Sequence, residues 1–275
     1  MLFGFASSMG DGVVTTCTER SPRSENRSIS TQRKPDLEES SSMSTASSLV
    51  ALLPVKGHSE RVPNKNFRPF LGKPLFRCIL DTLLNLDEID MVVINSDVPN
   101  KLREYGVDDS RRVQIRERRL EICGDFVSMN RIIEDDLNAV AAESYLMTHA
   151  TNPLLSEQTI RCALAVFRAD KVSGTHDSLF SVNAYRTRFY NTVGGAINHD
   201  PCNLVRTQDL EPWFEENSNL YLFTRQSFQE TRARIGRSPR LFETPRFESI
   251  DIDDMDGWIV AEAIGYHLKR RKVHP

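Results

Sequence analysis

The sequence has neither of the two glycine-rich fingerprints with which open α/β sheets most often hold phosphates. No G-x-G-x-x-G and no G-x-x-x-x-G-K-[ST] occurs in its 275 residues, which excludes the usual dinucleotide-binding turn and the P-loop. It also lacks H-E-x-x-H, G-x-S-x-G and any C-x-x-C pair. Zinc protease, serine hydrolase and structural-zinc functions therefore have no motif to support them.

Excess charge, long apolar runs and closely spaced cysteines are also missing. The formal net charge is −3, which gives no reason to expect nucleic acid as a partner. No apolar run is long enough to span a bilayer, so no membrane partner is expected. The five cysteines are odd in number and widely spaced. This favours free thiols in a reducing compartment and hence a cytoplasmic location.

Residues 1–48 differ in composition from the rest of the chain. They are rich in Ser and mixed charges and hold few large apolar side chains, so we expect a disordered extension. Ser and Arg also suit an organelle transit peptide, but the acidic residues from Asp11 to Glu39 are too many for a good one. A start of translation at Met43 is a third alternative.

Residues 49–275 alternate short apolar runs with helical patterns. The expected strands are Leu49–Leu53, Met91–Asn95, Val113–Ile115, Tyr145–Met147, Leu179–Val182 and Leu220–Phe223. Apolar helix faces recur between Met129 and Ala141, from Ile160 to Phe167, and over Met255–Leu268. The last helix is expected to face inward with Trp258, Ile259, Ala261, Ile264 and Leu268. This alternation predicts an α/β domain with a mostly parallel sheet and helices on both sides.

Residues 184–218 interrupt the alternation. They are polar, and Gly194, Gly195 and Pro201 are turn signals. An insertion of this kind between two strands is typical of an arm or hairpin that makes subunit contacts or covers a substrate. We therefore expect an inserted arm here.

The first strand is followed by a loop in which cations are concentrated. Lys56, Arg61, Lys65 and Arg68 are interleaved with the polar residues Ser59, Asn64 and Asn66. A triphosphate needs several cations and hydrogen-bond donors that converge on it, and ligands of open α/β sheets bind at the carboxyl ends of the strands. The alternative is a solvated basic loop.

Asp251 and Asp253 are spaced as residues that point to one side of an extended segment. Two such carboxylates suit Mg²⁺, which takes one or two carboxylates together with phosphate oxygens and water. The alternative is that Asp253 or Asp254 only caps the helix that follows. Capping does not require a strand-spaced pair, so the spacing favours the metal.

Three further segments carry polar side chains at positions that suit a ligand. His149 and Asn152 follow a predicted strand, at the ligand-facing edge of the sheet. Arg118 suits a phosphate contact or an exposed surface charge, and the sequence alone favours the exposed charge. The arm contributes Arg206, Gln208 and Asn217, which suit a sugar, a partner subunit or a plain loop.

Four segments, in this order, resemble the acylneuraminate (sialic acid) cytidylyltransferases, whose architecture the Kdo cytidylyltransferases share. Val55–Asn66 is similar to the family's A-R-G-G-S-K-x-I-P-x-K-N, and Ala150–Leu154 to its P-T-S-P-L. Residues 206–221 resemble R-x-Q-D-x-P…N-x-x-Y with altered spacing, and Ser249–Asp253 is an intact S-I-D-I-D. The resemblance covers residues 49–268.

The resemblance implies a three-layer αβα nucleotidyltransferase fold, Rossmann-like, with an inserted dimerisation arm and hence a homodimer. It also implies that CMP is transferred from CTP to the anomeric hydroxyl of a nonulosonic acid, with pyrophosphate released and Mg²⁺ held by Asp251 and Asp253. The implied catalytic residues are Lys65, Arg61 and Asp253. The implied CTP contacts are Lys56, Ser59, Asn66, Arg118, His149 and Asn152. The implied sugar contacts are Arg206, Gln208 and Asn217.

The sequence departs from the family pattern at three of these positions. Lys56 stands where Arg is usual, Glu60 where Lys is usual, and His149 where Gln is common. Glu60 reverses a charge beside the expected triphosphate, and Arg61 is available to replace it. Two alternatives therefore remain: a catalytically silent nucleotide-binding homologue, and a cytidylyltransferase for Kdo or another sugar.

Overall fold

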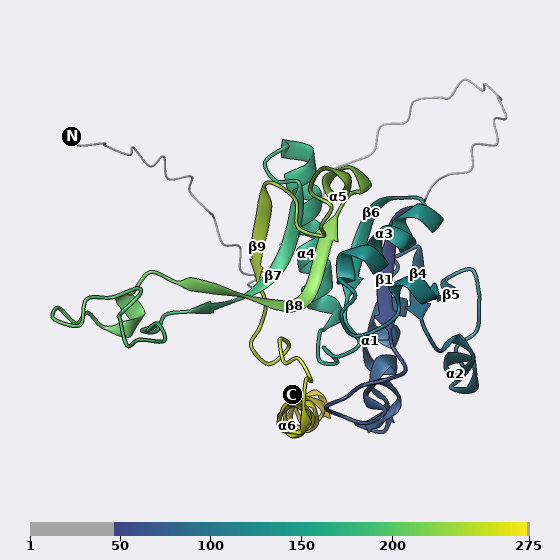
Figure 1. Ribbon diagram of the computed structural model, residues 1–275, viewed down its shortest axis with the longest axis horizontal. Helices are drawn as coiled ribbons and strands as arrows, with labels where there is room; N and C mark the ends of the chain where they lie inside the picture. The colour runs from purple at the N-terminus through teal and green to yellow at the C-terminus, as the bar shows by residue number, and fades with distance from the viewer. Residues whose placement is uncertain (1–46, 274–275) are drawn as a thin grey trace, which may run out of the picture.

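The computed structural model describes residues 47–273, so the extension expected over residues 1–48 lies almost wholly outside the described residues. A seven-stranded sheet runs in the order β5-β4-β1-β6-β8-β7-β9 (Figure 1). Its strands are β1 (Ser47–Val55), β4 (Met91–Ser96), β5 (Val113–Glu117), β6 (Ala142–Thr148), β7 (Ser178–Tyr185), β8 (Trp213–Phe223) and β9 (Pro239–Glu243). In this sheet only β8 runs antiparallel to its neighbours. The prediction of a mostly parallel sheet is confirmed.

Helices cover both faces of the sheet, and β1 shows why. Ala51, Leu53 and Val55 face one apolar cluster, while Val50 and Leu52 face another, because successive strand residues point to opposite sides. The first cluster is closed by α1 (Leu75–Leu84) and α4 (Glu157–Ser173), the second by α3 (Met129–Ala139) and α5 (Arg225–Thr231). Each fully buried Leu contributes roughly 1.5–3 kcal/mol, so this alternation favours the three-layer arrangement.

The segments around the first loop form a smaller packed unit. A short hairpin of β2 (Pro69–Phe70) and β3 (Lys73–Pro74) leads into α1. Phe70 meets the ring of Trp258 edge-on at 5.5 Å, and Trp258 belongs to α6 (Met255–Val273). Ile252 is buried in the same cluster. This packing brings the segment before α6 against the first loop.

The arm lies between β7 and β8, residues 186–212 (Figure 1). It projects from the sheet as a long excursion with one β-bridge, Tyr190 with Ala196, and a short 3₁₀ helix, Thr207–Asp209. Val193 is 88% exposed and Leu204 is 64% exposed. In the single chain, the arm therefore exposes apolar side chains to solvent.

Several details of the elements differ from the sequence predictions. β8 begins at Trp213, inside the segment expected to be an arm, and β9, α5 and α2 (Pro99–Glu104) were not anticipated. The last helix continues to Val273, and its Ile259 is 61% exposed, so the inward assignment of Ile259 is wrong. Trp258 and Ala261 are buried as predicted, and Ile264 and Leu268 are half-buried.

The cysteine prediction holds only in part. Cys78, Cys123 and Cys202 are free thiols. Cys162 is disulfide-bonded, so the expectation of free thiols alone is wrong for this residue. No helix in the part of the chain that the structure describes is both long and apolar enough to cross a membrane.

Candidate functional site

The carboxyl ends of β1, β4 and β6 meet at one edge of the sheet, because these strands are parallel neighbours. The loops that follow them contain most of the residues singled out in the sequence. The segment before α6 joins them, because the amide of Ile252 donates a hydrogen bond of 2.9 Å to the carbonyl of Thr151, just after β6. Segments about one hundred residues apart thus meet at the ligand-facing edge.

Lys65 lies at the centre of this edge. The preceding Asn64 adopts a left-handed conformation, with φ of 55°, and turns the chain into a short 3₁₀ helix that directs Lys65 inward. Lys65 is 8% exposed, and its Nζ donates a hydrogen bond of 2.6 Å to the carbonyl of Ile252. Burial lowers the pKa of Lys65, while the charges of Asp253 and Asp251 act in the opposite direction.

Asp251 and Asp253 face this ammonium, as their spacing predicts. Ile252 between them is wholly buried on the other side of the extended segment. Lys65 Nζ lies 3.8 Å from Asp253 Oδ1, and Arg61 Nη1 lies 3.6 Å from Asp253 Oδ2. The Arg61 pair is well exposed, so it is screened by solvent. Lys65, Arg61 and the two carboxylates therefore converge.

Asp251 is the more buried of the two carboxylates. Its Oδ1 is inaccessible to solvent and has no hydrogen-bond partner among the described residues. Burial raises the pKa of Asp251 and the nearby charge of Asp253 adds to this, while a hydrogen bond from the Thr151 side chain acts in the opposite direction. A buried carboxylate oxygen without a partner is costly unless a cation or donor meets it. The arrangement thus favours a bound cation.

These two carboxylates fit Mg²⁺. Within residues 47–273 no group of three or more His, Cys, Asp or Glu side chains is arranged to hold a metal. Mg²⁺ does not need one, because it takes one or two carboxylates and completes its shell with phosphate oxygens and water. Asp251 and Asp253 therefore suit a metal that arrives with a nucleotide, and do not suit a structural metal.

Other buried polar atoms near this edge also have no hydrogen-bond partner in the described part of the chain. They are Asn66 Oδ1, Thr148 Oγ1, Asn219 Oδ1 and both amide atoms of Asn152. Asn152 has no exposed surface at all. Native proteins rarely leave so many buried polar groups unpaired, and the atoms come from the first loop, the end of β6 and the neighbouring β8. A polar ligand at this edge would satisfy them.

Arg118 lies just beyond the end of β5 and is 7% exposed. Its Nε donates to Asn95 Oδ1 at 2.8 Å, and its Nη2 donates to the Asn95 carbonyl at 2.9 Å. Burial lowers the pKa of Arg118, which Asp97 partly offsets. Arg118 is therefore buried, and the prediction that it is an exposed surface charge is wrong.

The outer part of the first loop is arranged differently. Lys56 Nζ lies 2.6 Å from Asp125 Oδ1, and both side chains are partly exposed. Asn66 Nδ2 donates to the Lys56 carbonyl at 2.8 Å. Ser59 is half-buried and Glu60 is exposed. Lys56 therefore turns to the loop after β5, while Lys65 and Arg61 turn to the acidic pair.

His149 is held by an arginine that the sequence did not indicate. Arg234 Nη1 lies 3.1 Å from His149 Nε2, its Nη2 lies 3.1 Å from Glu216 Oε1, and its guanidinium lies 3.7 Å from the ring centre of Tyr221. Because arginine only donates, Nε2 accepts and the ring proton sits on Nδ1. Burial, with Arg234 and Lys65 nearby, lowers the pKa of His149 to about 3.

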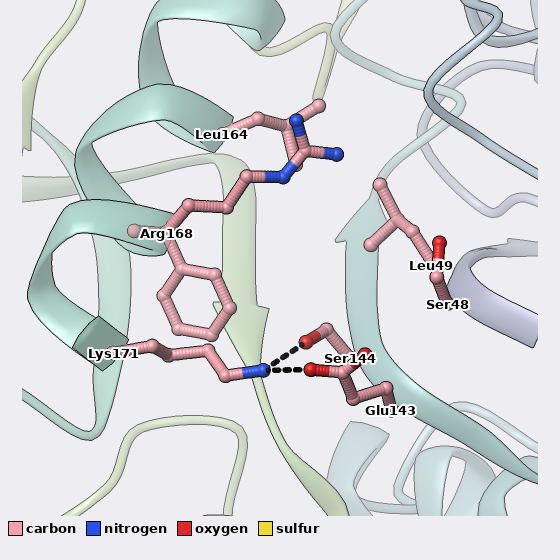
Figure 2. Close-up of a pocket in the computed structure, with 8 residues that line it drawn as sticks. Ser48, Leu49, Glu143, Ser144, Leu164, Arg168 and Lys171 are labelled. Carbon is pink, nitrogen blue, oxygen red and sulfur yellow. Dashed lines mark hydrogen bonds and ion pairs between the residues drawn. The ribbon is translucent and has the colours of Figure 1, made fainter. Parts of the chain in front are cut away.

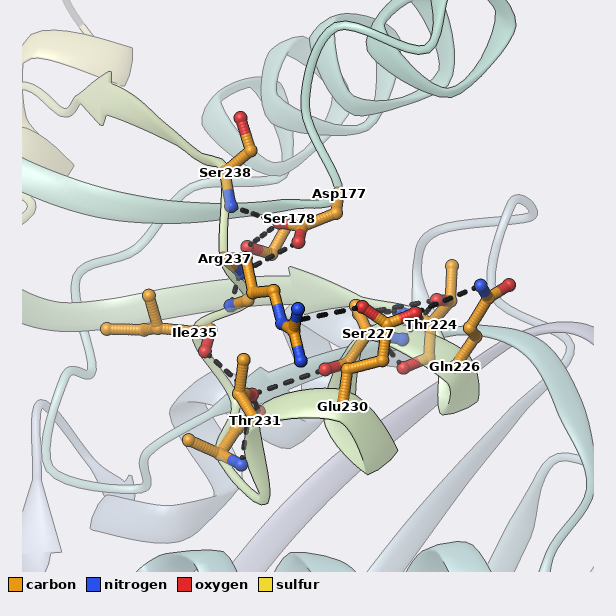
Figure 3. Close-up of polar contacts among 12 residues, drawn as sticks. Asp177, Ser178, Thr224, Gln226, Ser227, Glu230, Thr231, Ile235, Arg237 and Ser238 are labelled. Atoms are coloured by element: carbon orange, nitrogen blue, oxygen red, sulfur yellow. Dashed lines mark hydrogen bonds and ion pairs between the residues drawn. The ribbon is translucent and has the colours of Figure 1, made fainter.

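The loop that carries Arg234 is fixed at both ends (Figure 3). At one end Thr231 Oγ1 donates to the Ile235 carbonyl at 3.0 Å. At the other, Asp177 accepts from the amides of Arg237 and Ser238 at 2.7 and 3.2 Å. These contacts hold Arg234 over Tyr221 without any recognisable motif.

The three residues predicted to contact a sugar are separated. Arg206 and Gln208 lie in the projecting arm, where Arg206 pairs with Asp209 at 2.7 Å. Asn217 is buried in the middle of β8, where its Nδ2 donates to Asn183 Oδ1 at 3.0 Å and to Thr244 Oγ1 at 2.7 Å. Within one chain, only Asn217 joins the edge of the sheet.

A cavity of about 620 Å³ lies beside Asp251. It is bounded by β7, β8 and the start of α6, and Glu216, Asn217 and Arg246 line it. This volume is in the range of roughly 300–1,000 Å³ typical of small-molecule sites. The cavity thus provides room next to the acidic pair.

A second cavity, of about 80 Å³, lies at the opposite ends of β1 and β6 (Figure 2). There Lys171 Nζ donates to Glu143 Oε1 at 2.8 Å and to Ser144 Oγ at 3.1 Å. Its cation is thus already paired, and the cavity is too small for a nucleotide.

The fold is shared with solved structures of CTP-related enzymes. CMP:2-keto-3-deoxy-manno-octonic acid synthetase complexed with CTP superposes with a TM-score of 0.56 at 16% identity, over 81% of this chain and 100% of that chain. The 4-diphosphocytidyl-2C-methyl-D-erythritol synthase of Anaerococcus prevotii gives 0.59 at 11%, over 80% and 96%. The fold is therefore that of the α/β nucleotidyltransferases.

Residues 50–244 match the cytidylyltransferase family, and the chain belongs to this family of enzymes. It is 24% identical over 218 residues to a pseudaminic acid cytidylyltransferase of Campylobacter jejuni, covering 74% of this chain and 90% of the relative. It is 26% identical to the N-acylneuraminate cytidylyltransferase of Oncorhynchus mykiss, over 78% and 49%. It is 23% identical to the CMP-N,N'-diacetyllegionaminic acid synthase of Legionella pneumophila, over 78% and 95%.

Proposed function

We propose that this chain transfers CMP from CTP to the anomeric hydroxyl of a nonulosonic acid and releases pyrophosphate. The proposal rests mainly on one observation: Lys65 and Arg61 converge on Asp253, beside Asp251, at the carboxyl edge of the sheet. The names of the relatives, which act on pseudaminic, N-acylneuraminic and diacetyllegionaminic acids, support the substrate class.

CTP is proposed to lie across the ends of β1, β4 and β6. Lys65 and Arg61 would offset the charge of the triphosphate. The unpaired Nδ2 of Asn152 would donate to a phosphate oxygen, and the unpaired Oδ1 atoms of Asn66 and Asn152 would accept hydrogen bonds from the nucleoside. Arg118, at the end of β5, would contact the nucleotide with the N–H groups that Asn95 does not use. Lys56, Ser59 and His149 complete the proposed contacts.

Mg²⁺ is proposed to bind between Asp251, Asp253 and the phosphates. When bound, it would supply charge neutralisation for the triphosphate and for the departing pyrophosphate. Asp251 is suited to this role because its buried Oδ1 has no partner among the described residues. Lys65 fixes the segment between the two carboxylates through the Ile252 carbonyl.

In the proposed reaction the anomeric oxygen attacks the α-phosphorus. The new phosphorus–oxygen bond forms as the bond from the α-phosphorus to its bridging oxygen breaks. Pyrophosphate leaves with the electron pair, and the proton of the anomeric hydroxyl is released to water. Lys65 and Arg61 would offset the charge that this leaving group develops. Holding both reactants in line supplies much of the rate.

The acceptor sugar is proposed to occupy the cavity of about 620 Å³ beside Asp251. Carboxylate and amide groups line it, notably Glu215, Glu216 and Asn217, and such groups accept hydrogen bonds from sugar hydroxyls. We further propose a homodimer in which the arm of one subunit reaches the other, so that Arg206 and Gln208 act on the neighbouring cavity. The exposed apolar side chains of the arm support this.

Two other functions have specific support. Glu60 reverses a charge that the resemblance leads one to expect, which favours a silent nucleotide-binding homologue. The fold likeness to the 2-keto-3-deoxy-manno-octonic acid enzyme favours that acid as the acceptor. Lys65 and both carboxylates are present and face one another, which argues against a catalytically silent homologue.

The test is pyrophosphate release from CTP and Mg²⁺ with a panel of sugar acids: N-acetylneuraminate, deaminated neuraminate, Kdo, legionaminate and pseudaminate. We expect release with one nonulosonic acid. Release with Kdo alone would replace the proposed acceptor. No release, while calorimetry still detects CTP binding, would favour the silent homologue, and Glu60→Lys would then be the first substitution to make.

A further inference from the structure

Asp136 is a buried acid that lies outside the proposed catalytic pair. It lies in the last turn of α3, is 1% exposed, and is flanked in the helix by the buried residues Ile133 and Leu137. Buried carboxylates are rare unless they are paired and hydrogen-bonded. Its partners therefore indicate what the residue does.

Asp136 Oδ1 accepts two hydrogen bonds from the sheet. Asn95 Nδ2, at the end of β4, donates at 2.8 Å, and Arg116 Nη1, in β5, forms an ion pair with it. The adjacent Asp135 pairs with Arg116 Nη2 at 2.9 Å and with Arg119 Nε at 2.7 Å. Both acids therefore pair with Arg116, but of the two only Asp136 contacts Asn95.

The contact with Asp136 determines which way the Asn95 amide points. A carboxylate only accepts hydrogen bonds, so Nδ2 must face Asp136 and Oδ1 must face the opposite way. Oδ1 meets Arg118 Nε at 2.8 Å. A guanidinium only donates, so the reversed amide would set donors against donors at Arg118. The chain Asp136–Asn95–Arg118 therefore has one consistent arrangement.

The geometry points to Asp136 as a positioning residue: through Asn95 it holds the Arg118 guanidinium in the orientation in which that group contacts CTP. The inference rests on the proposed function, which assigns Arg118 to the nucleotide. Arg118 uses Nε and one N–H of Nη2 on Asn95, which leaves Nη1 and the second N–H of Nη2 for the nucleotide. A planar fork fixed at one end is pre-organised for a second set of bonds.

The central experiment is a double-mutant cycle of Asp136→Asn and Arg118→Gln, with the KM for CTP as readout. An amide at residue 136 no longer forces the Asn95 amide to one orientation. We expect each single variant to raise the KM for CTP about 10-fold or more, as for loss of hydrogen bonds to a charged group. The double variant should be no worse than Arg118→Gln alone, because coupled residues are not additive.

Asp135→Asn is the matched control. It removes the charge of the neighbouring acid, which also pairs with Arg116, but leaves the hydrogen bond between Asn95 and Asp136 in place. We expect Asp135→Asn to have a KM for CTP close to that of the wild type. Neither Asp135→Asn nor Asp136→Asn should change the KM for the sugar acid. Should Asp136→Asn fail to fold, Asn95→Ala breaks the same chain of contacts at its middle residue, and the same rise in the KM for CTP is expected.

The outcomes separate the inference from the proposed function. If Arg118→Gln raises the KM for CTP and neither Asp136→Asn nor Asn95→Ala does, the positioning role is refuted while the function stands. Additive effects in the cycle would also refute it, since they would mean that Asp136 acts by another route. If the wild type releases no pyrophosphate with any sugar acid, or if Arg118→Gln has no effect, the proposed function or the Arg118 assignment fails, and the inference fails with it.

Discussion

Removing the Arg234 guanidinium is the clearest structural perturbation of this site. Arg234→Met keeps a stem of similar length but leaves His149 Nε2 without its donor, Glu216 without its ion pair, and the face of Tyr221 without its cation. The Arg234 side chain is 17% exposed, so little water is available to replace these contacts. We expect a less stable protein with a freer His149 ring.

The magnitude follows from the three contacts. The hydrogen bond to His149 is worth about 0.5–1.5 kcal/mol, and the cation–π contact about 0.5–2 kcal/mol. The Glu216 side chain is 41% exposed, so its ion pair adds only about 0–1 kcal/mol. The free energy of unfolding should therefore fall by about 1–4.5 kcal/mol. For a domain of this size roughly 2–4 °C of Tm corresponds to each kcal/mol, which gives a loss of about 2–18 °C.

The assay is thermal and urea unfolding of the full chain, with Arg237→Met as control. Arg237 lies in the same loop, is 72% exposed, and approaches Glu230 only to 3.8 Å, so its loss should cost within about 0.5 kcal/mol. Equal effects of the two substitutions would refute the reasoning. So would a His149 ring that titrates near pH 6.5 in the wild type, because burial and Arg234 should keep it neutral over that range.

Three other substitutions have defined expectations. Asp253→Asn should reduce kcat by at least 100-fold with little change in Tm, because Asp253 is exposed but faces Lys65; retained turnover in the pyrophosphate assay would remove the metal assignment. Lys56→Met should change stability by at most about 1 kcal/mol, because its pair with Asp125 is exposed, and should raise the KM for CTP several-fold. Asp170 has a pKa lowered by hydrogen bonds from Arg240, so it stabilises the fold at pH values above its unfolded pKa, and this contribution is lost as the pH falls through the folded one. Asp170→Asn should therefore flatten the loss of stability below about pH 4, as measured by urea unfolding from pH 3 to pH 7; an unchanged slope would contradict this linkage.

The sheet was predictable because its strands carry their own signal. Leu49–Leu53 is apolar throughout, which is typical of a short strand buried on both faces. The structure places its side chains in two different clusters, one on each face of the sheet. Ile259 was misassigned for the opposite reason. An apolar residue on a helix satisfies the periodicity test whether or not a neighbour covers it, and here none of the described segments does so fully.

The convergence of Lys65 with Asp253 was predictable only through the resemblance, since the two lie far apart in sequence and no periodicity connects them. Arg234 could not be found, because its contact with His149 spans 85 residues and its loop has no motif. Asp136 did carry a signal: an acid between Ile133 and Leu137 interrupts the apolar face of a helix. Such an acid calls for a partner, but its identity, Asn95, depends on how the helix lies across the sheet.

The most direct measurement is the detection of the product itself. The wild-type chain, incubated with CTP, Mg²⁺ and the nonulosonic acids, should form a CMP-linked sugar acid, seen by ³¹P NMR as a new phosphodiester signal in equal amount to pyrophosphate. Omission of the sugar acid should abolish both signals. Pyrophosphate without the phosphodiester, or CTP left intact with every nonulosonic acid, would contradict the proposed transfer.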